Sequence, residues 1–253
     1  MQIFNLSGKI AIVTGGNQGI GFGIARGLAI AGATIVIANR RAPEGEMAAE
    51  SLKKEGLNAV SIPTDVSRES SIATLVSKVM NDFGVIDILV NNAGVTVRKT
   101  AENISKDDWD YIMDINLKGV FFCCQLAGRE MINRRKGKII NISSDLSQKA
   151  MQEKSVYATS KAGVSHLTRC LALEWAKYNI NVNAIGPGLT ITPMNKDLYD
   201  KYPEKLKQIL HSLPVGKACD TSDYAGAAVF LASEASNFVI GQTIFVDGGS
   251  TVG

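Results

Sequence analysis

The sequence predicts an α/β fold in which one parallel β-sheet carries helices on both faces. Short runs rich in Val, Ile and Thr alternate with longer amphipathic segments along the whole chain, which is typical of a doubly wound sheet. The 253 residues, 45% of them hydrophobic, are enough for one large core. Because no repeat, low-complexity segment or flexible linker divides the chain, we expect a single domain over residues 1–253.

The elements follow one another in a regular order. Seven runs of β-branched residues predict strands at residues 9–13, 34–38, 59–62, 86–90, 138–142, 181–185 and 243–246. Six amphipathic stretches predict helices near residues 20–31, 44–55, 69–83, 108–133, 155–177 and 222–233. Each of the first six strands is followed by a helix, so successive strands can lie parallel.

One irregular region precedes the last predicted helix. Residues 190–214 are charged and aromatic, include Tyr199 and Tyr202, and have only a weak helical pattern. Long insertions of this kind often cover active sites. We therefore predict a substrate lid near residues 190–214.

Charge, hydropathy and cysteine content argue against several classes of protein. A net charge of +3, from 27 basic and 24 acidic side chains, predicts no nucleic-acid or membrane partner. No apolar run reaches the roughly 18 residues of a membrane span, and residues 1–9 do not resemble a signal peptide. The cysteines lack CxxC spacing, and neither histidine has a nearby ligand, so we expect no metal site. These features predict a cytoplasmic protein.

A glycine-rich turn joins the first predicted strand to the first predicted helix. Glycine lets the backbone approach a phosphate closely, and a helix start directs free N–H groups and a positive dipole end at the anion. A glycine cluster alone is common, but this position in a βαβ unit favours a dinucleotide site. The turn supplies the candidate cofactor residues Gly15, Asn17, Gln18, Gly19, Ile20 and Gly21.

The end of the second strand bears on the choice of nucleotide. An acidic residue there usually binds the adenine ribose of NAD, but this strand ends in Asn39, Arg40 and Arg41. Two guanidinium groups could clamp a 2′-phosphate. The sequence therefore favours NADP, whereas an arginine that only stacks on adenine or faces solvent would leave NAD possible.

Further motifs carry a resemblance to a known family. The glycine turn is followed by Asn91-Asn92-Ala93-Gly94, Asn116, Ser144, Tyr157-xxx-Lys161, Pro187-Gly188 and Val246-Asp247-Gly248-Gly249. In this order and spacing, over nearly the whole sequence, they resemble the classical short-chain dehydrogenase/reductase family. The resemblance implies a single-domain Rossmann fold with strand order 3-2-1-4-5-6-7, a nicotinamide cofactor and a homotetramer.

The resemblance also assigns the remaining cofactor residues. Asp65, with Val66, should lie at the adenine, and the segment from Asn91 to Gly94 should line the adenosine side. The segment from Pro187 to Thr192 should hold the nicotinamide, with Thr192 in the place of the carboxamide-binding threonine. The implied cofactor set therefore adds Asp65, Val66, Asn92, Ala93, Gly94, Tyr157, Lys161, Pro187, Gly188, Thr190 and Thr192.

The chemistry is predicted to centre on Tyr157 and Lys161. Four residues apart on one helix, their side chains share a face. The ammonium of Lys161, together with the positive ring of the oxidised cofactor, should lower the pKa of the phenol from about 10. Tyr157 would then donate a proton in reduction and accept one in oxidation.

Two further residues complete the predicted catalytic set. Ser144 lies thirteen residues before Tyr157, where the family's serine hydrogen-bonds the substrate oxygen; adjacent Ser143 is the alternative. Asn116 matches the family's asparagine that steadies a water beside the lysine, although an asparagine inside a long helix could also be a packing or kink feature.

For the substrate, the sequence predicts a chemical class. A polar rim of Asp145, Gln148, Gln152, Lys154, Asn195 and Lys196 suits a small hydroxylated alcohol or ketone, and the chain most resembles the gluconate 5-dehydrogenase and 2-keto-3-deoxygluconate dehydrogenase branch. One alternative is a 3-oxoacyl-[acyl-carrier-protein] reductase, but Leu173 stands where a second docking arginine beside Arg129 is usual. A cofactor-dependent binding or regulatory module would lack Tyr157, Lys161 or Ser144, and all three are present.

Overall fold

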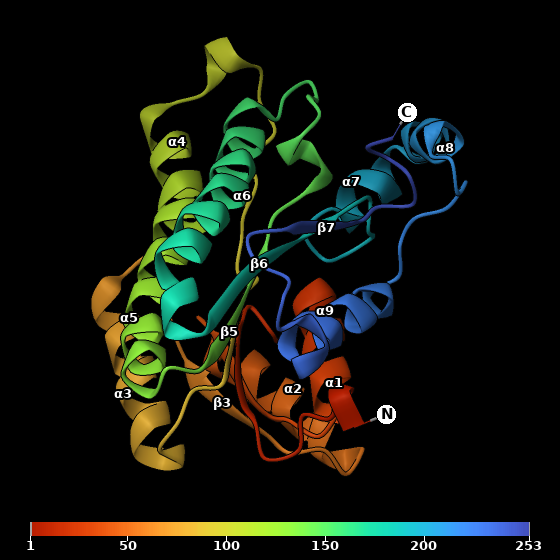
Figure 1. Ribbon diagram of the computed structural model, residues 1–253. Coiled ribbons are helices and arrows are strands. Elements are labelled where there is room, and N and C mark those ends of the chain that lie inside the picture. The colour runs from red at the N-terminus through yellow and green to blue at the C-terminus, as the bar shows by residue number, and fades with distance from the viewer. Residues whose placement is uncertain (1, 253) are drawn as a thin grey trace.

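A seven-stranded parallel sheet forms the centre of the protein (Figure 1). The computed structural model describes residues 2–252. The strands are β1 (Ile10–Thr14), β2 (Thr34–Asn39), β3 (Ala59–Pro63), β4 (Ile88–Asn91), β5 (Gly137–Ile142), β6 (Ile180–Pro187) and β7 (Thr243–Val246). Their order is β3-β2-β1-β4-β5-β6-β7, which confirms the predicted fold class and strand order.

Alternate side chains along a central strand such as β1 belong to two different hydrophobic cores, one on each face of the sheet. Ala11 and Val13 of β1 belong to the core beneath one helix layer, whereas Ile10 and Ile12 belong to the core on the opposite face. Successive strand side chains point to opposite faces. Strands buried on both faces read as continuous apolar runs, so the pattern of β1 requires a helix layer on each side.

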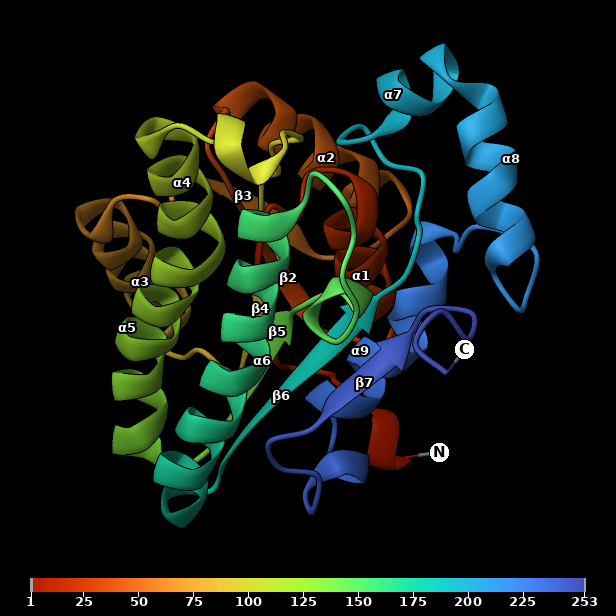
Figure 2. The same ribbon diagram turned by 90° about the horizontal axis from the view of Figure 1, so that it is seen from above.

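The helices form those two layers. On one face are α1 (Gly19–Ile30), α2 (Ala42–Lys54) and α9 (Ala225–Ala232). The other face carries α3 (Glu69–Phe83), α4 (Lys106–Met113), α5 (Gly119–Arg134) and α6 (Ser155–Trp175). Figure 2 separates the two layers, with α3 to α6 on one side of the sheet and α1, α2 and α9 on the other.

The long helix expected at residues 108–133 differs from the prediction. It begins at Lys106, after the capping box of Ser105 and Asp108, and a π-helical segment, Asp114–Lys118, separates α4 from α5. A π segment inserts one extra residue into a helix and often marks a functional site. A pattern read at 3.6 residues per turn cannot locate such an insertion, because the apolar face resumes beyond it.

The region predicted as a lid contains two short helices, α7 (Lys196–Lys201) and α8 (Pro203–Ser212). They project beyond the end of the sheet near the C-terminus (Figures 1 and 2). A bridge between Thr190 and Cys219 connects the start of the region to the chain just beyond its end, and Cys219 N donates to the Leu189 carbonyl at 2.8 Å. Across residues 2–252, no helix is both long and apolar enough to span a membrane.

Candidate active site

Two adjoining cavities lie at the carboxyl ends of the strands. The larger, about 410 Å³, runs from the glycine turn past Tyr157 to the segment holding α7 and α8. A second, about 290 Å³, lies at the end of β2 and shares Gly15, Asn17 and Gln18 with the first. Open α/β sheets bind ligands in this crevice, where the strand order reverses; here β1 stands between β2 and β4.

The predicted cofactor and catalytic residues converge on these cavities, with two exceptions. All of them line one cavity or the other except Asn91 and Asn116, and Asn116 is fully buried. Asn91, expected at the adenosine side, is also buried, and its Nδ2 donates to Asn141 Oδ1 at 2.9 Å. Asn91 therefore contributes to the polar interior between β4 and β5 rather than to the cavity wall.

The glycine turn has the backbone shape that a phosphate requires. Gly15 and Gly19 have φ angles of +63° and +56°, which side chains other than glycine rarely adopt. A Cβ on Gly21 would lie 2.3 Å from both Asn92 Nδ2 and the Gly15 oxygen. Gln18, which precedes α1, makes no side-chain cap, so no capping side chain covers the N–H groups of the first turn. This open cradle fits a dinucleotide pyrophosphate.

The next loop holds the glycine turn in place. Thr14 Oγ1 accepts hydrogen bonds from the backbone N–H groups of Asn92 and Ala93, both at 3.0 Å. Asn92 Nδ2 donates to the carbonyls of Thr14 at 2.9 Å and Gly15 at 3.1 Å. The Asn-Asn-Ala-Gly motif therefore holds the backbone of the glycine turn in place and also forms part of the cavity wall.

Arg40 and Arg41 line the smaller cavity together with Asn17 and Gln18. Both arginines are exposed, but they differ in their partners. Arg41 Nε lies 2.9 Å from Glu44 Oε1, whereas Arg40 has no ion-pair partner within the described part of the chain. Arg40 is therefore the freer cation for a ligand phosphate. Asp65 lies farther along the wall, where its carboxylate accepts from Ser67 N at 3.0 Å.

Tyr157 and Lys161 share one face of α6 and both line the larger cavity. Lys161 is 4% exposed; its Nζ donates to the Ile142 carbonyl at 2.7 Å and lies 5.9 Å from the centre of the Tyr157 ring. Burial lowers the pKa of Lys161 to about 8. This ammonium can therefore lose its proton close to neutral pH.

Burial acts on Tyr157 in the opposite direction from the expected effect of Lys161. It raises the pKa of the phenol to about 12; a hydrogen bond with Ser144 opposes this rise, and the negative charge of Asp145 adds to it. The free protein thus keeps Tyr157 protonated, as a proton donor requires. In the free protein, therefore, the expected lowering of the Tyr157 pKa does not occur.

The two adjacent serines face in different directions. Ser143 Oγ donates to the Lys161 backbone carbonyl at 3.0 Å and lies 2.7 Å from Ser165 Oγ, so it fastens β5 to α6. Both serines line the cavity beside Tyr157, but the Ser144 hydroxyl donates to Asp145 Oδ1 at 3.0 Å and accepts from Leu146 N at 3.1 Å. Of the two, Ser144 is therefore the one whose hydroxyl is not bonded to α6.

Asn116 lies within the π-helical segment Asp114–Lys118. Its Oδ1 accepts from Val95 N at 2.8 Å, and its Nδ2 donates to the Val95 carbonyl at 2.9 Å and to Ser160 Oγ at 3.2 Å. Asn116 thus connects the loop after β4 to α6, beside Lys161. The extra residue of the π segment and the buried Asn116 side chain therefore occur at the same place in the chain.

The two threonines expected at the nicotinamide are placed differently. The Thr190 hydroxyl is buried and bonds Tyr224 OH at 2.5 Å. Thr192 is partly exposed and faces the glycine turn, since its Cγ2 would lie 3.3 Å from a Cβ on Gly19. Thr192 is therefore the residue available to a ligand, and Thr190 supports the wall behind it.

The substrate end includes residues that the sequence did not reveal. Asp145, Lys154 and Asn195 of the expected polar rim line the cavity, but Gln148, Gln152 and Lys196 do not. Arg98, Lys149 and Ser250 line it unexpectedly. The only sequence signals were that Arg98 follows the Asn-Asn-Ala-Gly motif by four residues and that Ser250 directly follows Asp-Gly-Gly.

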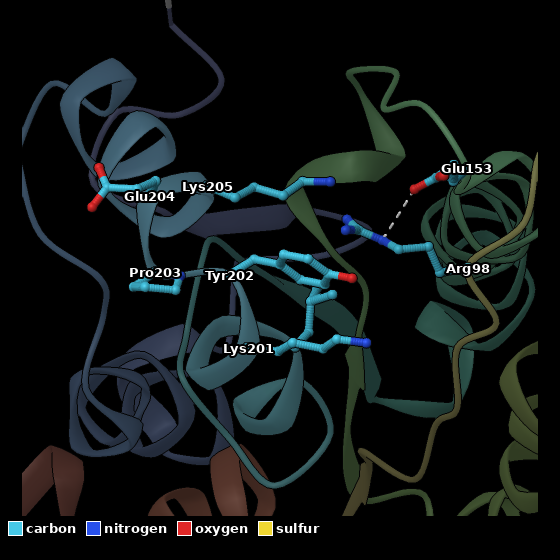
Figure 3. Close-up of a pocket in the computed structure, with 8 residues that line it drawn as sticks. Arg98, Glu153, Lys201, Tyr202, Pro203, Glu204 and Lys205 are labelled. Carbon is cyan, nitrogen blue, oxygen red and sulfur yellow. Dashed lines mark ion pairs between the residues drawn. The ribbon is translucent and has the colours of Figure 1, made fainter.

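Arg98 separates this cavity from an outer one of about 600 Å³ (Figure 3). Its Nε lies 3.6 Å from Glu153 Oε2, yet Nε and Nη1 are buried and make no hydrogen bond. Across the outer cavity, the polar ends of Lys201, Tyr202 and Lys205 point toward the Arg98–Glu153 pair (Figure 3). Buried N–H groups that make no hydrogen bond are costly, so Nε and Nη1 of Arg98 leave this side of the site suited to an anion.

Comparisons with known proteins agree with this geometry. A family model described as Enoyl-(Acyl carrier protein) reductase matches residues 15–251. A 2-dehydro-3-deoxy-D-gluconate 5-dehydrogenase of Dickeya dadantii (strain 3937) is 44% identical over 250 residues, 98% of each chain. A gluconate 5-dehydrogenase of Gluconobacter oxydans (strain 621H) is 39% identical over 251 residues, 99% of this chain and 98% of the relative.

A solved structure is similar over its full length. The crystal structure of a gluconate 5-dehydrogenase from Burkholderia cenocepacia J2315, in complex with NADP and tartrate, has a TM-score of 0.95 and 40% sequence identity. The match covers 100% of this chain and 98% of that one. The strand order, the glycine cradle and these matches lead to the same family.

Proposed function

This chain belongs to the short-chain dehydrogenase/reductase family and is an NAD(P)-dependent oxidoreductase of small alcohols and ketones; from this premise, we propose that its substrate is a sugar acid. The observation that carries the proposal is Arg98, whose guanidinium has buried N–H groups without hydrogen-bond partners in the wall of the substrate cavity. A carboxylate is the usual planar partner of such a group.

Lys154 adds a second positive charge to this part of the cavity. Its Nζ donates to Thr96 Oγ1 at 2.6 Å and lies 5.6 Å from the centre of the Tyr157 ring. Burial, and then the nearby charge of Arg98, lower the pKa of Lys154 to about 8. A bound carboxylate would offset that repulsion, so the pair favours an anionic substrate near the reacting centre.

Replacing Arg98 by Met tests the proposed carboxylate contact. We expect KM for the sugar acid to rise about ten- to a hundredfold, the value of one charge-assisted hydrogen bond, with a much smaller change for the corresponding sugar alcohol. Steady-state kinetics on both compounds measure this difference, with Arg26→Met, which removes a surface arginine paired with Glu55, as the control. Equal losses on the acid and the alcohol would contradict the assignment.

The catalytic roles are part of the same proposal. When bound, the nicotinamide supplies or accepts the hydride. Tyr157 donates its hydroxyl proton to the substrate oxygen in reduction and takes it back in oxidation. Lys161 stabilises the phenolate, and the Ser144 hydroxyl hydrogen-bonds the substrate oxygen. Asn116 is proposed to steady a water beside Lys161, in keeping with its buried position between Val95 and Ser160.

NADP is the proposed preferred form of the cofactor. Arg40, Asn17 and Gln18 would surround a 2′-phosphate in the smaller cavity, while Arg41 is partly engaged by Glu44. The open glycine cradle would take the pyrophosphate, and Thr192 would face the carboxamide. This division makes Arg40 the main source of nucleotide preference.

Arg40→Ala is therefore expected to lower the NADP-to-NAD ratio of kcat/KM about tenfold or more, because a charge-assisted contact is lost. The comparison of both nucleotides in the wild type and the variant measures the ratio. Arg41→Ala, with its arginine already paired, is the matched control and should change the ratio less. An unchanged preference in Arg40→Ala would rule out the proposed 2′-phosphate contact.

The two alternative functions gain no support. Leu173, where a docking arginine would stand in a carrier-protein reductase, is 82% exposed and lies on α6. The complete set of Tyr157, Lys161 and Ser144 at one cavity argues against a binding module without turnover. Failure of every sugar acid, polyol and simple ketone to react with either nucleotide would favour such a module.

Location and assembly are proposed from the surface and the cysteines. The four cysteines are free thiols in the described chain, and Cys123 and Cys124 are buried, which supports a reducing compartment such as the cytoplasm. In classical family members, subunits contact one another through the helices that correspond to α5 and α6. Phe121 on α5 and Leu173 on α6 are exposed apolar side chains, and they support the proposed homotetramer.

A further inference from the structure

Three polar side chains beside Ser144 are not used by the roles proposed above. They are Asp145, Lys149 and Ser250, which we call the Asp145 cluster, and all three line the substrate cavity. Asp145 follows the end of β5, whereas Ser250 belongs to the segment after β7. Arg98 comes from the loop after β4, and β5 and β6 stand between β4 and β7 in the sheet. The cluster is therefore a separate part of the cavity wall.

The members of the cluster are bonded to one another and to Ser144. Asp145 Oδ1 accepts from Ser144 Oγ at 3.0 Å, and Oδ2 accepts from Ser250 Oγ at 2.9 Å. Lys149 Nζ lies 2.9 Å from Asp145 Oδ2 and also donates to Ser250 Oγ. Two segments distant in sequence thus meet at one carboxylate, directly beside the serine proposed to contact the reacting oxygen.

These contacts leave hydrogen-bonding capacity on both charged groups. An ionised carboxylate offers about four acceptor positions, and the partners of Asp145 are Ser144, Ser250 and Lys149. The Lys149 ammonium has three protons, and its partners are Asp145 and Ser250. The Asp145 side chain is 12% exposed and the Lys149 side chain is 35% exposed, and both line the cavity. Each therefore has a position left for a ligand.

The segment that carries Ser250 is fixed rather than loosely attached. Asp247 Oδ1 accepts from Gly249 N at 3.0 Å, and Oδ2 accepts from Thr251 N at 2.9 Å and Thr251 Oγ1 at 2.7 Å. These bonds close a tight turn around Ser250. A site held in this way before binding loses little free energy in ordering itself around a ligand.

We propose that the Asp145 cluster binds a hydroxyl group on the carbon next to the reacting carbon. That hydroxyl would donate to Asp145 Oδ1 and accept from Lys149 Nζ, while the reacting oxygen lies at Ser144. Because Ser144 and Asp145 are adjacent and bonded, the recognised group must also be adjacent to the reacting one. The enzyme therefore selects vicinal diols, or the corresponding hydroxyketones, over simple secondary alcohols. This inference rests on the proposed role of Ser144.

The test uses two compounds that differ by the one hydroxyl and carry no carboxylate. The stereoisomers of butane-2,3-diol and of butan-2-ol are assayed with NADP by steady-state kinetics, and the diol-to-alcohol ratio of kcat/KM is the readout. We expect the wild type to prefer the diol at least about tenfold. Asp145→Asn and Lys149→Met should each bring the ratio toward one. Asp82→Asn, which breaks an exposed ion pair with Lys78 on α3, is the matched control and should keep it.

Each result distinguishes the cluster from its alternatives. A wild type without diol preference, or equal losses on both compounds in Asp145→Asn, would overturn the proposal and leave Asp145 as a support for Ser144. Should Asp145→Asn not fold, Lys149→Met, whose side chain is more exposed, decides in the same way. Diol preference without any sugar-acid oxidation would refute the proposed substrate but keep the cluster, and the reverse would refute only the cluster.

Discussion

Tyr157→Phe is expected to lower kcat about a thousandfold in both directions, because general acid–base catalysis contributes on this order. Phenylalanine keeps the ring between Lys154 and Lys161 and removes the hydroxyl that exchanges the proton. Reduced-nicotinamide absorbance, followed with a keto sugar acid and its alcohol, measures the loss. The affinity for NADP and the midpoint of thermal unfolding should stay close to those of the wild type.

A second tyrosine supplies the control for this substitution. Tyr178, which follows α6, packs against Arg135 and Lys177 far from the reaction, so Tyr178→Phe should retain its kcat. If Tyr157→Phe kept a tenth or more of the wild-type kcat, another group would have to supply the proton. A comparable loss of NADP affinity would instead assign Tyr157 a role in binding.

Local patterns were sufficient to predict the sheet and many of the residues that line the cavities at its carboxyl edge. β1 shows why: an apolar run that feeds both cores must be a buried parallel strand, and the glycine turn that follows it has few structural uses. Gly15 and Thr192 hold fixed places in motifs that follow strands, and both line the larger cavity. Their positions along the chain therefore indicate their positions in space.

The substrate end could not be predicted in the same way. Arg98 and Ser250 meet the cavity from loops after β4 and β7, which only the folded sheet brings together. Ser143 and Ser144 are neighbours of identical chemistry, but Ser143 is hydrogen-bonded to α6 whereas Ser144 is bonded to Asp145 and Leu146. Gln148 looked equally suitable for the rim, yet it lines a shallow surface pocket with Leu173 and Phe245. Exposure and partners, rather than residue type, decide these cases.

Lys161→Met is expected to lower kcat for alcohol oxidation about a hundred- to a thousandfold. Each pKa unit by which the ammonium favours the phenolate corresponds to about 1.4 kcal/mol, and two to three such units are roughly what a close opposite charge supplies. In contrast to the loss of activity, the free energy of unfolding of Lys161→Met should be higher than that of the wild type below pH 8. Burial lowers the pKa of Lys161 from 10.5 to about 8, so below pH 8 the folded protein carries a charged, buried ammonium at a cost on the order of 3 kcal/mol.

The pH dependence of this variant separates the two effects. As the pH rises from about 8 toward 10.5, folded Lys161 becomes neutral while the unfolded lysine stays charged, so the wild type gains stability that Lys161→Met cannot gain. Thermal unfolding at pH 7 and pH 9.5 measures this difference, and the variant should be at least as stable as the wild type at pH 7. A variant less stable at pH 7 would show that the bond to Ile142 outweighs the burial of charge.

The rate of ketone reduction should depend on the protonation of Lys161, and a variant of Lys154 serves as the comparison. With NADPH, whose reduced ring is uncharged, kcat/KM for ketone reduction is expected to fall as the pH rises through about 8, because the Lys161 ammonium is lost. The pKa of Lys154 is also about 8, so Lys154→Met is the necessary comparison. The fall should persist in Lys154→Met and disappear from the residual activity of Lys161→Met. The opposite pattern would assign the titration to Lys154, whose Nζ also lies close to the Tyr157 ring, 5.6 Å from its centre.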